Sequence, residues 1–170
     1  MVKDYLPILL IPAAWVLSFL TIVYPRISSY WIEHMHYFML IFLTVFAILG
    51  WRRLSEEEVI STWRNIIVAG IPFTVIGTAA FLMPQYSSIL GGTAIAYWIA
   101  APGIGFYLTA DSMEGGQIYR KLAIASLISA VIFVTGALMN MPYIMGTSFV
   151  IVAIAQTISI LKASRMDKEW

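Results

Sequence analysis

The chain has 170 residues, of which 61% are hydrophobic and 11% are charged, and it contains no cysteine. Soluble domains carry roughly 25% charged residues, so this composition indicates an integral membrane protein. The net charge of +1 predicts no nucleic-acid partner, and the lack of cysteine excludes disulfides, thiol catalysis and iron–sulfur clusters from this chain.

Six apolar stretches follow one another, and each is close to the roughly 20 residues that cross a bilayer as a helix. They cover about residues 5–24, 30–50, 65–83, 88–109, 122–140 and 143–162. Backbone groups in lipid must be hydrogen-bonded within their own segment, which predicts helices. We therefore expect an all-α integral membrane protein with six transmembrane helices, in a single membrane domain that covers residues 1–170.

Basic residues predict the orientation of these helices. Nine of the ten lie on one side of a six-span chain: Lys3, Arg52, Arg53, Arg64, Arg120, Lys121, Lys162, Arg165 and Lys168. Arg26 alone lies on the other side. Because Lys and Arg stay cytoplasmic, we expect both termini to be cytoplasmic and the protein to be a multi-pass protein of the plasma or inner membrane. The first stretch is too long and too aromatic for a signal peptide, so it is predicted to be a retained span.

The second stretch begins with the only two histidines, His34 and His36, beside the acid Glu33. Residues two apart on a helix diverge by about 200°, so these histidines cannot hold one ion together. Glu33 and His36 share a face, which makes them the candidate metal ligands. His36 with Met83 or Met141 is a candidate haem site. The residue types favour a plainer interpretation, a polar helix start that lies at the lipid headgroups, so we expect no metal or cofactor here. Besides this interpretation and ligand binding, a third is pH sensing by the histidines.

The polar loop 51–64 is predicted to begin the third helix on the inner surface. Ser55 and Glu58 have the spacing of a capping box. The apolar residues that follow share one helical face. We expect a helix that starts in this loop and runs into the third span.

Three tight turns between the stretches each contain a proline, at Pro25, Pro84 and Pro142. A small residue precedes each proline by six or seven positions: Ser18, Gly77 and Gly136. Proline ends a helix, and a small residue lets two helix backbones approach. Because the turns recur at a near-constant period, we predict three antiparallel hairpin repeats, over about residues 5–50, 65–110 and 122–165.

The repeated unit of glycine, six residues, proline, a short polar turn and a second apolar helix resembles the HdeD-type acid-resistance membrane proteins. Residues 76–108 show the unit best. The first copy has Ser18 in place of glycine, and the third is one residue short between Gly136 and Pro142. The resemblance implies a small inner-membrane protein linked to stress tolerance, with no agreed catalytic residues.

The interiors of the predicted spans contain no Asp, Glu, Lys, Arg or His. Ionisable groups inside a membrane usually mark ion paths or proton relays, so their absence argues against a proton pump, a retinal protein or an ion-coupled transporter.

Gln156 is the strongest polar group in a span. It suits a hydrogen bond between helices, and it is also the candidate ligand for a quinone carbonyl. Asp111 and Glu114, in the loop before the fifth span, are a second candidate pair of metal ligands. The sequence of this loop is otherwise typical of a flexible turn.

The fourth span carries Gly92, Ala96 and Ala100, small residues four apart. Such a face predicts close contact with another helix, within the chain, in a homo-oligomer or with other membrane subunits.

Two function classes follow from these patterns. The first is a membrane protein without a catalytic site that has a structural, stress-linked or accessory role. The second is the membrane anchor subunit of a larger respiratory or metalloenzyme complex, binding haem, metal or quinone near the outer face.

Overall fold

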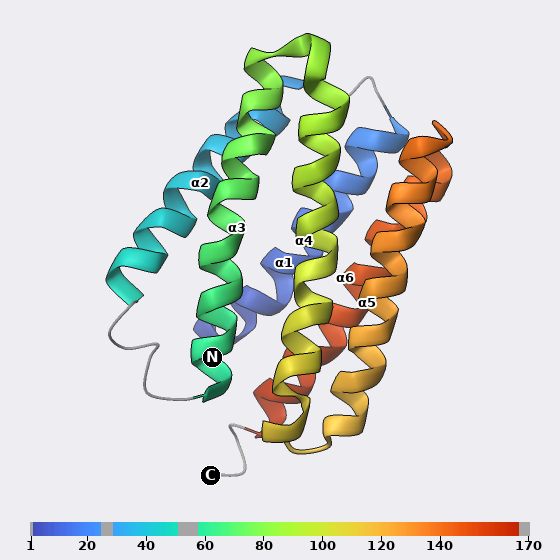
Figure 1. Cartoon of the computed structure of the whole chain (residues 1–170). Coiled ribbons are helices and arrows are strands. Elements are labelled where there is room, and N and C mark those ends of the chain that lie inside the picture. The colour runs from blue at the N-terminus through green and yellow to red at the C-terminus, as the bar shows by residue number, and fades with distance from the viewer. Residues whose placement is uncertain (1, 25–28, 51–57, 167–170) are drawn as a thin grey trace.

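The computed structural model describes residues 2–24, 29–50 and 58–166, which form helices joined by short turns, with no strand among them (Figure 1). The helices are α1 (Val2–Val23), α2 (Ser29–Gly50), α3 (Glu58–Leu82), α4 (Ser87–Thr109), α5 (Gly116–Leu138) and α6 (Pro142–Met166). Two 3-10 turns, η2 (Pro84–Tyr86) and η3 (Ala110–Ser112), flank α4. The predicted all-α class is confirmed for these residues.

Four segments are long and apolar enough to cross a membrane. They are Glu58–Leu82, Pro84–Ser112, Gly116–Leu138 and Pro142–Lys162. Within α1 and α2, the apolar stretches found among the described residues are shorter, Ala13–Val23 and His36–Val45. The structure therefore supports four spans, and the count of six stays a prediction.

The helix boundaries follow the turn residues of the sequence. α3 is continuous from Glu58 to Leu82 and so starts earlier than the apolar stretch itself. Pro84 opens η2, and Pro142 is the first residue of α6, where a missing backbone donor costs nothing. Ser55 of the predicted capping box and the turn at Pro25 lie outside the described residues.

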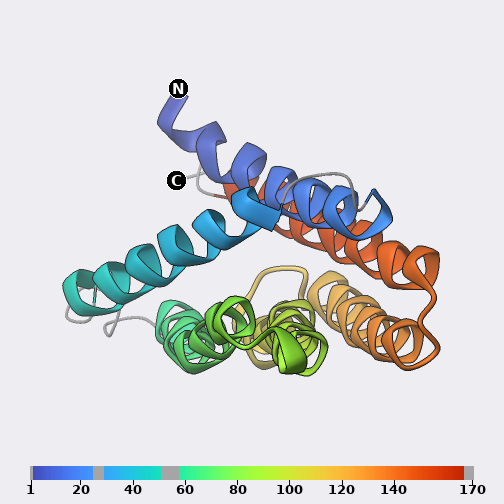
Figure 2. The same cartoon turned by 90° about the horizontal axis from the view of Figure 1, so that it is seen from above.

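Neighbouring helices pack in the order α2, α3, α4, α5, α6, α1, and α4 also contacts α6. Seen from above, α3, α4 and α5 form one row and α1 lies along α6 in a second (Figure 2). The predicted hairpins α3–α4 and α5–α6 are packed pairs. The helices of the first predicted hairpin instead find different partners, because α1 packs on α6 and α2 on α3.

Aromatic residues fill the space between these rows. Ile99, Phe133, Phe149 and Val152 form one buried cluster from α4, α5 and α6, and α1 adds partly buried side chains to it, including Phe19. A second cluster from the same three helices surrounds Phe106 and Tyr119 at the other end of α4. The attachment of α1 therefore depends on aromatic contacts with the three-helix core.

Glycines let α3 and α4 interlock. A Cβ on Gly70 of α3 would lie 2.5 Å from the Trp98 indole of α4, and a Cβ on Gly105 of α4 would lie 2.7 Å from the Trp63 indole of α3. Each helix thus supplies one glycine and one indole, and the two glycine–indole pairs lie at different heights along the helices. The Trp98 indole N–H also donates a 3.1 Å hydrogen bond to the Thr74 hydroxyl. Only glycine leaves room for these rings.

Candidate functional site

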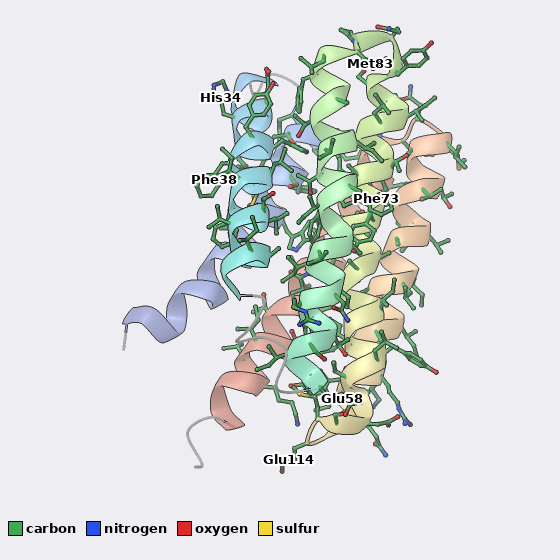
Figure 3. All side chains as sticks on the ribbon, turned by 60° about the vertical axis from the view of Figure 1, so that its left-hand side comes forward. His34, Phe38, Glu58, Phe73, Met83 and Glu114 are labelled. Carbon is green, nitrogen blue, oxygen red and sulfur yellow. The ribbon has the colours of Figure 1, made fainter. Side chains whose placement is uncertain are left out.

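Glu33 and His34 lie at the start of α2, at the end of the molecule that also carries Met83 (Figure 3). The Tyr37 hydroxyl donates a 2.8 Å hydrogen bond to the Glu33 carboxylate. The exposed His34 ring meets Tyr37 edge to face, with ring centroids 6.3 Å apart. These three side chains therefore form one polar group at this helix end.

His36 lies against α3 instead. Its ring meets Phe81 edge to face at 5.3 Å between centroids, and a Cβ on Gly77 would lie 3.3 Å from the imidazole. The two histidines therefore contact different neighbours, as expected from their spacing on one helix. Gly77, singled out by its place before Pro84, is buried where His36 of α2 and Ala94 of α4 both approach α3.

The candidate metal ligands are not gathered into a cluster. Among the described residues, no group of three or more His, Asp or Glu side chains is placed to hold a metal ion. Glu33 is hydrogen-bonded to Tyr37. At the opposite end of the molecule, Asp111 forms an exposed ion pair with Arg120, 2.5 Å between Oδ1 and a guanidinium nitrogen. Glu33 and Asp111 are thus each bonded to another side chain of the protein.

Gln156 joins two helices. Its side-chain oxygen accepts a 2.8 Å hydrogen bond from the indole N–H of Trp15, so that α6 is tied to α1. Trp15 also packs against Phe149, with ring centroids 5.7 Å apart. Gln156 therefore holds the interhelical hydrogen bond that its residue type suggests, and the indole of α1 is held at both its polar and its apolar side.

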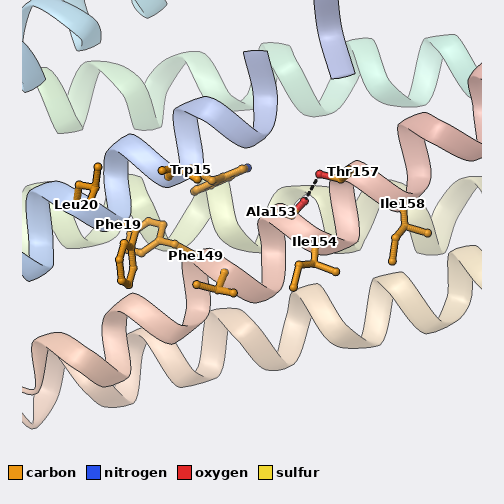
Figure 4. A pocket seen from close by; sticks show the side chains of 10 residues that line it. Trp15, Phe19, Leu20, Phe149, Ala153, Ile154, Thr157 and Ile158 are labelled. Atoms are coloured by element: carbon orange, nitrogen blue, oxygen red, sulfur yellow. Dashed lines mark hydrogen bonds between the residues drawn. The ribbon is translucent and has the colours of Figure 1, made fainter. Parts of the chain in front are cut away.

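A groove of about 520 Å³ runs between α1 and α6 (Figure 4). Its walls are Trp15, Val16, Phe19 and Leu20 of α1, and Phe149, Val150, Ala153, Ile154, Thr157 and Ile158 of α6. The Thr157 hydroxyl is satisfied within its own helix, because it donates a 2.7 Å hydrogen bond to the Ala153 carbonyl. The groove is therefore apolar, and it suits a hydrocarbon chain better than a polar substrate. Sequence patterns do not predict it, because its two walls are more than 100 residues apart.

A shallower groove of about 370 Å³ lies between α4 and α5. Ala96 and Ala100, two of the three small residues that predict close helix contact, line it together with Ala130. A Cβ on Gly92 would meet nothing within 4 Å. The predicted small face of α4 is thus partly open, and the closest approaches within the chain occur at other glycines.

Described basic side chains collect at the end of the molecule opposite His34. Arg64 lies in the second turn of α3, Arg120 and Lys121 in the first turns of α5, and Lys162 in the last turns of α6. Figure 3 shows Glu58 and Glu114 at this same end. This end therefore carries the described basic residues, and the His34 end carries Glu33 with polar and aromatic groups.

No family model, curated protein or solved structure matches the chain. The resemblance to HdeD-type proteins thus rests on the hairpin pattern alone, and the function has to be argued from the geometry.

Proposed function

We propose that the chain is a six-span protein of the plasma or inner membrane, with both termini cytoplasmic, that has a structural, stress-linked or accessory role without a catalytic site of its own. The observation that supports this proposal best is the distribution of apolar and polar side chains across the helices. The surface suits lipid, and the polar groups inside suit helix packing.

The outward surface is apolar at mid-helix. Ile41, Ile124, Val131 and Ile154 are each more than half exposed in the isolated chain. Burying such a side chain contributes about 1.5–3 kcal/mol, so a water-soluble protein would place many of them inside. If lipid surrounds the helices, these exposed apolar side chains carry no such cost.

The polar groups inside the bundle are small. The buried polar side chains among the described residues are the hydroxyls Thr74, Thr78, Thr109, Ser126, Ser129, Ser148 and Ser159. Most of them donate to a carbonyl, as Ser129 does to Ser148 of α6 at 2.8 Å. Small hydroxyl residues are typical of helix interfaces in membranes. The Ser129 bond joins α5 to α6, whereas the other donors bond a carbonyl of their own helix and so need no polar partner elsewhere. An interior of this kind supports a structural or accessory role.

The experiment is purification in mild detergent, with identification of the proteins that accompany the chain and a visible absorption spectrum. An accessory role predicts a stable homo-oligomer or a defined membrane partner and no stoichiometric chromophore. The alternative from the sequence, an anchor subunit that binds haem, metal or quinone, predicts a Soret band, a metal or an extracted quinone at one equivalent. That second result would overturn the proposal.

A further inference from the structure

We draw no further inference here: the strongest candidate, the apolar groove between α1 and α6 that Trp15, Phe149 and Ile154 help to line, carries none, because nothing in the part of the chain that the structure describes shows what covers it.

Discussion

Single polar side chains in the helices act here as hydrogen-bonding partners between helices. The Tyr97 hydroxyl of α4 donates to the Ile66 carbonyl of α3 at 2.6 Å, and Trp15 of α1 donates to Gln156 of α6 at 2.8 Å. Such bonds contribute about 0.6 kcal/mol on average in membrane proteins and up to about 1.7 kcal/mol. Their importance is greatest where a helix has few other neighbours, as α1 does.

Gln156→Leu is expected to lower the free energy of unfolding by about 1 kcal/mol, because the Trp15 indole N–H loses its acceptor in an apolar region. Unfolding from mild detergent into sodium dodecyl sulfate measures the change. In a double-mutant cycle with Trp15→Phe, the two effects should not add. Thr157→Val, which removes a hydrogen bond within α6 only, is the control. Full additivity would show that the two side chains do not interact.

Replacing both His34 and His36 with Gln is expected to leave metal content and the absorption spectrum unchanged, because the two rings contact different neighbours. Loss of the edge contact between His36 and Phe81 should cost at most about 1 kcal/mol of stability. Metal analysis and a visible spectrum of the purified double variant check this. A stoichiometric metal or chromophore that disappears with the histidines would favour the cofactor-subunit hypothesis.

At the scale of helix pairs, glycine positions decide how closely two helices approach. Gly70 and Gly105 admit indoles between α3 and α4. A Cβ on Gly136 would lie 2.7 Å from the Met145 backbone nitrogen of α6. Gly92 borders open space. Glycine in a membrane helix is thus a packing residue at some positions and not at others, and the neighbouring helix makes the difference.

Gly70→Ala and Gly92→Ala form a matched pair with opposite expected signs. A methyl group at Gly70 collides with the Trp98 ring, so the free energy of unfolding should fall by about 1–3 kcal/mol. At Gly92 the methyl group has room, and the loss of glycine's backbone freedom should raise stability by about 0.5–1 kcal/mol. Detergent unfolding of both variants measures the difference. Equal effects would contradict the interlocked packing of α3 and α4.

At the scale of the whole molecule, alternation of helix direction places the ends of α4 and α6 together with the starts of α3 and α5. The described basic side chains Arg64, Arg120, Lys121 and Lys162 lie at that end. By the positive-inside rule, this is the end that the proposed orientation places in the cytoplasm. The proposed orientation therefore depends on charges carried by three different helix ends, those of α3, α5 and α6.

Reporter fusions at residue 28 and residue 170 are expected to report opposite compartments, with residue 170 cytoplasmic. A fusion at residue 112 should agree with residue 170, and one at residue 85 should agree with residue 28. Activities of a periplasmic and a cytoplasmic reporter measure each site. The same compartment at residues 28 and 170 would rule out six spans with both termini inside.

The class of the protein and the ends of several helices could be predicted from the sequence. Apolar length and the backbone's need for internal hydrogen bonds predict helices, and Pro84 and Pro142 mark the turns where η2 and α6 begin. The divergence of His34 and His36 follows from helix geometry alone. For Gln156 the sequence left two roles open; the structure shows the hydrogen bond between helices, with Trp15 as its donor, and the quinone role stays a prediction.

The tertiary structure alone decided which helices pack together and where the grooves lie. α1 pairs with α6, not with α2, and the groove and the Gly70–Trp98 contact join residues far apart in the chain. In a soluble protein the apolar face of a helix would reveal its buried side. Here lipid-facing and core-facing positions are both apolar, since lipid is as apolar as a leucine side chain, and so the pattern along a helix does not indicate its partner.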